Sequence, residues 1–271
     1  MKKLIAMLLA LTLVVALAAC NNAPAETTPE TTAATEPVTE PVTEPATEPA
    51  TEPDTEPAST AMTYEEFMAA EVDAIVTIES YVQATQGWWD NTIVIYLQGP
   101  DGAYFSYGTK CAEEDAAKLV PGVKIRITGT KAEFNGEIEV MDGEFEFIEG
   151  ADSFIAEPLD VTALMGTDEL AQHMNKKVCF KGVTVAAAND EGAAFLYKWD
   201  GSGKAGDDLY FNVTIGEQTY NFCVESYLTG DGSEVYEAVE SWKVGDVVDL
   251  EGFLYWYNAA QPHITAVTVA Q

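Results

Sequence analysis

The loop DGSGKAGDD, residues 200–208, gathers residue types that often hold a small ligand. Its GSGKAG segment fits the GxGxxG pattern of dinucleotide-binding loops, in which a helix begins after the glycines and faces the pyrophosphate. Here Asp207 and Asp208 follow, and then a strand-like run, so the helix dipole is missing and two carboxylates would repel a phosphate. Lys204 precedes alanine where a P-loop has Ser or Thr, so the sequence excludes both kinds of phosphate loop.

The same loop carries side chains with hard oxygen donors, which Ca²⁺ prefers. They are Asp200, Ser202, Asp207 and Asp208. An EF-hand does not fit, because Ala205 stands where that loop requires glycine. Two interpretations remain: a structural Ca²⁺ site, the one cofactor that the sequence suggests, or a solvated acidic hairpin.

Residue types that perform catalysis are scarce. The only histidines are His173 and His263, and neither belongs to an HxxxH or HExxH pattern. There is no GxSxG motif, and Arg126 is the only arginine. We therefore expect no enzyme and no catalytic residue.

Aromatic residues give a better signal for binding. Trp88 and Trp89 lie in the loop between the first two expected strands, where small β-barrels often take ligands. Strand alternation predicts Tyr96 and Tyr104 on the outer face of the next two strands. Such rings stack on sugars as well as on bases. The alternative is that the two tryptophans pack against a second domain or close a barrel end, whereas FLYWYN at 253–258 is expected in the core and domain interface.

The elements that position these residues occur twice. The pattern of VPGVKIRITG at 120–129 recurs in KVGDVVDLEG at 243–252, and equivalent residues are 123 positions apart. The equivalent pairs are Gly122 and Gly245, Gly129 and Gly252, and Asn135 and Asn258. Around each copy the pattern predicts three strands, a helix and two further strands.

Each copy is preceded by a short amphipathic helix. The first begins at Thr63, which forms a capping box with Glu66, and the second is TDELAQHM at 167–174. The second copy has one strand too many, so either residues 193–199 or residues 219–226 are an insertion.

The N-terminus predicts export. Residues 1–19 form a lipoprotein signal peptide, since two lysines and an apolar run end in Leu-Ala-Ala before Cys20. The lipobox predicts lipidation of Cys20; the alternative is an ordinary signal peptide with an incidental cysteine. Residues 20–61 hold six TEP units, which predict a disordered, extended stalk.

The charge of the chain limits its possible partners, and the number of cysteines limits its possible disulfides. The chain has 13 basic and 45 acidic residues; two of the basic residues lie in 1–19 and nine of the acidic ones in 20–61. The remaining 62–271 therefore carry 11 basic and 36 acidic residues, a balance that disfavours nucleic acid. Three further cysteines, Cys111, Cys179 and Cys223, allow one disulfide between the last two, or free thiols in a core.

With its lipobox, TEP stalk, WWDN loop, DGSGKAGDDLYF and VDLEGFLYWYN, the chain resembles tandem OB-fold lipoproteins of Gram-positive gut bacteria. The resemblance implies a mainly β protein with two OB-fold-like five-stranded Greek-key barrels, each with short helices, after the stalk. The domains are expected at 62–151 and 152–271. It further implies a lipid-anchored protein on the extracytoplasmic face of the cell membrane, and it implies no activity.

We therefore expect a cell-surface binding module without catalytic activity, whose partner is an extracellular glycan, peptide or protein. The membrane is expected to be reached through the lipid anchor only. Two alternatives remain: nucleic-acid binding, which many OB folds perform, and a structural role in a cell-envelope complex.

Overall fold

The structure is a computed structural model that describes residues 61–269. The expected signal peptide, Cys20 and all of the TEP stalk up to Thr60 lie outside the described residues. Both barrels belong to one compact unit of the chain. Within 61–269, no helix is both long and apolar enough to cross a membrane.

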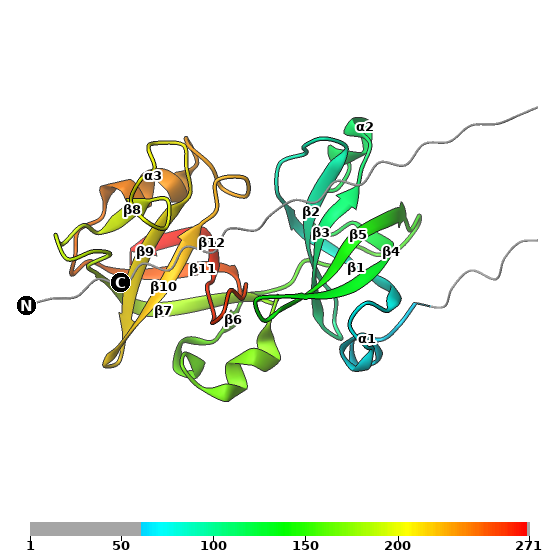
Figure 1. The fold of residues 1–271 in the computed structure, drawn as a ribbon, viewed down its shortest axis with the longest axis horizontal. Coiled ribbons are helices and arrows are strands. Elements are labelled where there is room, and N and C mark those ends of the chain that lie inside the picture. The colour runs from blue at the N-terminus through cyan, green and yellow to red at the C-terminus, as the bar shows by residue number, and fades with distance from the viewer. Residues whose placement is uncertain (1–60, 270–271) are drawn as a thin grey trace, which may run out of the picture. The chain divides into compact units, whose positions relative to one another are not determined.

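The first barrel closes in the strand order β1-β2-β3-β5-β4 (Figure 1). All neighbouring strands are antiparallel except the parallel pair β3–β5. Its elements are α1 (Tyr64–Ala69), β1 (Ile75–Thr85), β2 (Thr92–Gln98), β3 (Ala103–Lys110), α2 (Glu113–Ala116), β4 (Lys124–Phe134) and β5 (Glu137–Phe147). A five-stranded Greek-key barrel with a helix between its third and fourth strands is an OB fold.

The second barrel repeats this order. Strands β7, β9, β10, β12 and β11 follow one another, and β7 pairs with both β9 and β11, so the ring closes. Its elements are β7 (Lys177–Ala186), β9 (Leu209–Ile215), β10 (Gln218–Val224), α3 (Glu234–Ser241), β11 (Val247–Phe253) and β12 (His263–Val269). The parallel pair of the first barrel has its counterpart in β10 and β12. The protein is therefore a tandem OB-fold protein.

Short elements are added around the second barrel. Residues 149–158 and β6 (Leu159–Asp160) lead to η1 (Thr162–Leu164) and η2 (Asp168–His173) before β7. The expected helix at 167–174 is thus a 3₁₀ helix, and its Thr167 makes no capping hydrogen bond. The strand β8 (Phe195–Tyr197) pairs only with β9, so residues 193–199 are the insertion and 219–226 hold the third barrel strand.

The first pair of repeated glycines, Gly122 and Gly245, forms the same turn in both barrels. Gly122 and Gly245 have φ of 92° and 99°, a left-handed conformation that favours glycine. The Gly122 N–H donates to Val82 O of β1 at 2.8 Å, and the Gly245 N–H donates to Val185 O of β7 at 2.8 Å. Each glycine turn therefore ties the start of the fourth strand to the first strand of its own barrel.

Local signals in the first copy are confirmed. The Thr63 side chain accepts from the Glu66 N–H, and the Glu66 carboxylate accepts from the Thr63 N–H, so the capping box is complete. Asn135 and Gly136 take φ of 51° and 90° in the two-residue turn between β4 and β5. These values fit a type I′ hairpin.

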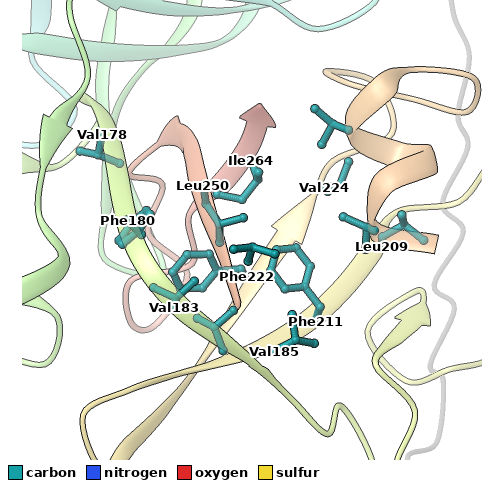
Figure 2. Packing of buried hydrophobic residues seen from close by; sticks show 14 of the residues in the cluster. Val178, Phe180, Val183, Val185, Leu209, Phe211, Phe222, Val224, Leu250 and Ile264 are labelled. Atoms are coloured by element: carbon teal, nitrogen blue, oxygen red, sulfur yellow. The ribbon is translucent and has the colours of Figure 1, made fainter. Parts of the chain in front are cut away.

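Each barrel has its own core, built from alternate residues of its strands. In the second barrel, Phe180, Phe211 and Phe222 meet at the centre, with aliphatic side chains from β7, β9, β10, β11 and β12 around them (Figure 2). The three cysteines of the barrels are free and buried, as the thiol alternative expects.

A third cluster joins the two barrels. Tyr96 and Phe105, on the outer face of β2 and β3, are buried against Phe253 at the end of β11. The rings of Tyr96 and Phe253 stack with centroids 4.5 Å apart. The prediction that FLYWYN supplies core and domain interface is confirmed for Phe253 and Leu254, but Tyr257 is 46% exposed.

Candidate ligand-binding cleft

A cleft of about 850 Å³ lies between the two barrels, and we call it the inter-barrel cleft. The first barrel contributes the loop β1–β2 (Gln86), strand β3 (Phe105, Tyr107) and the hairpin β4–β5 (Phe134). The second barrel contributes the equivalent elements, namely the segment between β7 and β9, the strands β9 and β10, and the loop β11–β12. In OB folds these elements bind oligonucleotides and oligosaccharides. Both barrels therefore turn toward one cleft the face that binds ligands in other OB folds.

Every exposed aromatic side chain among residues 61–269 lies at this cleft or at a smaller hollow beside it. The smaller hollow has a volume of about 300 Å³ and shares Gln86, Tyr107 and Tyr227 with the cleft. The exposed aromatic residues are Trp89, Tyr107, Phe134, Trp199, Tyr227 and Tyr257. Exposed aromatic side chains gathered at one place are uncommon on a protein surface, and such a concentration is typical of a binding site.

The two barrels meet at the rim of the cleft through equivalent loops. Phe134 and Tyr257, which are 123 residues apart, pack with ring centroids 6.0 Å apart. The Asn258 N–H donates to Asn135 O at 2.7 Å. An aromatic-Asn dipeptide thus occupies the equivalent position of each copy, and the structure brings these two dipeptides together.

Two uncharged side chains, Tyr96 and His263, form a hydrogen-bonded pair at the floor of the cleft. The Tyr96 hydroxyl lies 2.7 Å from Nδ1 of His263, and the Tyr255 ring stacks on the imidazole with centroids 4.3 Å apart. Burial lowers the pKa of His263 to about 3 and raises the pKa of Tyr96 well above its usual value. His263 is therefore uncharged, and its Nδ1 shares a hydrogen bond with the Tyr96 hydroxyl.

Besides its tyrosine hydroxyls, the Trp199 indole and the neutral His263, the cleft is lined by three amide side chains and one carboxyl. Gln86, Asn221 and Gln261 line its wall, and Glu225 lies near the floor residue Cys223. Burial, followed by the nearby charge of Asp208, raises the pKa of Glu225 to about 7. None of the described residues that line the cleft is lysine or arginine. The cleft suits a ligand with hydroxyl or amide groups better than one with phosphates.

The predicted tryptophans have different roles. Trp88 packs against the core of the first barrel, and its Nε1–H donates to Cys111 O at 2.9 Å. These contacts give Trp88 a packing role within the first barrel, while closure of a barrel end stays a prediction. Trp89 is 77% exposed and lines the smaller hollow, so it remains a candidate for ligand contact.

The expected exposure of Tyr96 and Tyr104 is wrong, because both are fully buried. Tyr96 does lie on the outer face of its barrel, but the second barrel covers it. Tyr104 faces the core, since it pairs with the core residue Leu97 across β2 and β3 and paired residues share a face. Phe105, one position later, takes the outer face.

The acidic loop does not gather its oxygens at one point. Asp200 accepts from Ser202, with 2.6 Å between Oδ1 and Oγ, and the Asp207 carboxylate accepts from the Lys204 N–H. The Asp208 carboxylate accepts from the N–H and hydroxyl of Ser226. No group of three or more His, Cys, Asp and Glu within 61–269 is placed to hold a metal ion. The Ca²⁺ site stays a prediction.

Sequence reasoning did not identify most of the cleft. It missed Tyr107, Phe134, Trp199, Tyr227 and Tyr257 as exposed aromatic residues. One signal was available: the offset of 123 residues that aligns the glycines also aligns Phe134 with Tyr257. An aromatic residue at the same hairpin position of both copies indicates a shared role.

Comparisons with known proteins give limited information. The sequence matches no model of a protein family. No curated protein matches it either. The Ifi202 HINa domain in complex with 20bp dsDNA matches 72% of this chain and 97% of its own, at 10% identity and a TM-score of 0.34.

Two further solved structures are similar at the same level. A replication protein A heterotrimer bound to ssDNA matches 71% of this chain and 49% of its own, at 10% identity and a TM-score of 0.30. The single-stranded DNA binding protein from Thermus aquaticus matches 72% and 91%, at 12% identity and a TM-score of 0.25. The strand order of the barrels, and not these matches, carries the assignment of the OB fold.

Proposed function

We propose that the protein is a lipid-anchored, non-enzymatic surface module that binds an extracellular oligosaccharide in the inter-barrel cleft. One observation carries this proposal: both barrels present their ligand-binding elements to one cleft, and every exposed aromatic residue of 61–269 surrounds it or the adjoining hollow. The anchor and the stalk follow from the N-terminal sequence and hold the barrels away from the membrane.

The chemistry of the cleft supports a sugar. Faces of pyranose rings carry C–H groups that pack on aromatic rings, and Trp199, Tyr227 and Tyr257 offer such surfaces at different points of the rim. Amide groups such as Asn221 and Gln261 can both donate to and accept from sugar hydroxyls. A cleft of about 850 Å³ falls in the range of sites that hold several sugar units.

A nucleic-acid strand is the second candidate, because the same rings would stack on bases. Three solved structures with which this chain has a weak likeness are described as bound to DNA or as DNA-binding. Affinity for a nucleic-acid backbone comes mainly from Lys and Arg, and the lining of the cleft provides neither within the described residues. Charge therefore favours the oligosaccharide.

The test is calorimetry on residues 21–271, which keep the stalk and both barrels. The probes are hexamers of cellulose, xylan, mannan, chitin and chitosan, together with a dodecamer of deoxythymidine. We expect one of the sugar hexamers to bind, and Trp199→Ala or Tyr257→Ala to weaken that binding by about tenfold, which corresponds to about 1.4 kcal/mol. Ile155→Ala, an exposed apolar residue that does not line the cleft, is the matched control.

Three results would count against the proposal. They are binding of none of the sugar hexamers, sugar binding that both cleft variants leave unchanged, and binding of the deoxythymidine strand alone. If the strand binds and its affinity falls steeply with salt, the protein is a nucleic-acid-binding protein.

A further inference from the structure

The inner part of the inter-barrel cleft holds two carboxyl groups and, among the described residues, no cation beside them. Glu225 lines the cleft, and Asp208 lies beside it. The Asp208 carboxylate is held in place, because its Oδ1 accepts from Ser226 N at 2.9 Å and from Ser226 Oγ at 2.6 Å. The one histidine in the lining, His263, is neutral. Within the described residues, no salt bridge involves Glu225 or Asp208.

The Glu225 carboxyl is incompletely satisfied. Its Oε2 is covered from solvent and has no hydrogen-bond partner within the described residues. A covered carboxyl oxygen without a partner is unfavourable, so such groups are uncommon unless a proton, or a ligand toward which the side chain turns, completes them. The groups that face Glu225 do not supply a cation, since they are Asp208, Tyr210, Cys223 and Tyr96.

Aromatic side chains line the same cleft as this carboxyl. Tyr210, Tyr227 and Tyr255 line the cleft together with Glu225. A cationic amine gains free energy both from a carboxylate within about 4–6 Å and from the faces of aromatic rings, and the two contributions operate together in sites for ammonium groups. A phosphate or carboxylate ligand would be repelled by the same arrangement.

We propose that the oligosaccharide carries free, positively charged amino groups, and that Glu225 is the residue that selects for them. The ligand class is thus an amino sugar polymer of the glucosamine type, in contrast to its neutral N-acetylated form. This inference rests on the proposed function, because it assigns the sugar class that the same cleft takes. An amine near Glu225 stabilises the charged carboxylate, so binding releases the proton that the empty cleft holds at neutral pH.

The experiment compares two probes of equal length on residues 21–271: the chitosan hexamer, which has free amines, and the chitin hexamer, which is N-acetylated. Calorimetry is run at mildly acidic pH, where the amines are charged. We expect the protein to bind the chitosan hexamer about tenfold or more tightly than the chitin hexamer. Glu225→Gln, which keeps the shape of the side chain, is expected to abolish that preference.

Two controls separate selection from a structural effect. Glu217→Gln removes an exposed carboxyl in the turn between β9 and β10 and should leave the preference unchanged. Proton release, measured at the same mildly acidic pH from binding heats in two buffers that differ in ionisation enthalpy, should accompany binding of the chitosan hexamer to the native protein, because the amines are already charged and Glu225 is protonated there. It should be absent in Glu225→Gln, whose thermal unfolding confirms that it is folded.

The outcomes distinguish this inference from the proposed function. If a sugar still binds and Trp199→Ala weakens that binding, two results overturn the amino-sugar inference alone. They are equal affinity for both hexamers and a preference that survives in Glu225→Gln. Absence of binding by every sugar probe overturns both.

Discussion

Replacing Glu137 with glutamine should change how the stability of the protein depends on pH. Glu137 is the first residue of β5 and has no exposed surface. Its Oε2 accepts from the Trp256 N–H of the second barrel at 2.9 Å, whereas its Oε1 has no partner. Oδ1 of Asn175 is another buried oxygen without a partner, and Asn175 lies next to this carboxyl. A protonated Glu137 could donate to that oxygen and satisfy both groups at once.

Burial raises the pKa of Glu137 from 4.5 to about 8, and the nearby Asn175 amide and the hydrogen bond from the Trp256 N–H oppose this only in part. The folded protein therefore holds a proton that the unfolded chain releases at a lower pH. This contribution to stability is complete below about pH 4.5 and is lost as the pH rises through about 8. The difference between 8 and 4.5, at about 1.4 kcal/mol for each pH unit, gives at most about 5 kcal/mol.

Glutamine copies the protonated carboxyl without being able to ionise. We therefore expect Glu137→Gln to have an unfolding free energy close to that of the native protein at low pH. Its advantage should grow to several kcal/mol at alkaline pH, with about 5 kcal/mol as the upper limit. Urea unfolding, followed by tryptophan fluorescence at a series of pH values, measures this difference.

The control is Glu133→Gln, which removes an exposed carboxyl on the neighbouring strand β4. Its difference from the native protein should vary little with pH, because it keeps both Glu137 and the buried Glu139, whose pKa is raised to about 7 by burial. The reasoning is refuted if Glu137→Gln differs from the native protein by the same amount at acidic and alkaline pH.

Three further substitutions test individual contacts by urea unfolding. Gly136→Ala should destabilise the protein by about 1–2 kcal/mol, because its φ is 90° and a Cβ would come within 2.9 Å of the Trp256 ring; no loss would show that this turn is not constrained. Arg126→Gln should cost less than about 1 kcal/mol and should cost less at high salt, since its ion pairs with two glutamates of neighbouring strands are partly exposed; a larger, salt-independent loss would contradict this. Tyr236→Phe should cost about 1–2 kcal/mol, because the buried hydroxyl donates to Asp207 O at 2.7 Å and accepts a backbone N–H; an unchanged midpoint would argue against this role.

The architecture could be predicted from local patterns. The glycine turns at Gly122 and Gly245, the capping box at Thr63 and the Asn135 turn all depend on residues close in sequence, and each is found as expected. Because the second copy repeats these patterns, two barrels of one kind also followed. The insertion at 193–199 could not be distinguished from a barrel strand, since both segments have the composition of strands.

The cleft depends on contacts that no local pattern encodes. Tyr104 was assigned to the wrong face because alternation gives the spacing of a strand and not its absolute orientation, which the pairing with Leu97 determines. Tyr96 was assigned to the correct face, but its burial requires the second barrel, 157 residues later at Phe253. Residues such as Trp199 become part of a site only when the two barrels meet.

The most direct test of the central claim, that an oligosaccharide binds in the inter-barrel cleft, uses the indole N–H signals of the five tryptophans in a nitrogen-15 NMR titration. With a sugar hexamer that binds, we predict that the signal of Trp199, which lines the cleft, shifts in proportion to occupancy. Trp242, which packs on Phe211 in the second barrel, should stay in place. Binding that leaves the Trp199 signal unchanged would contradict the account.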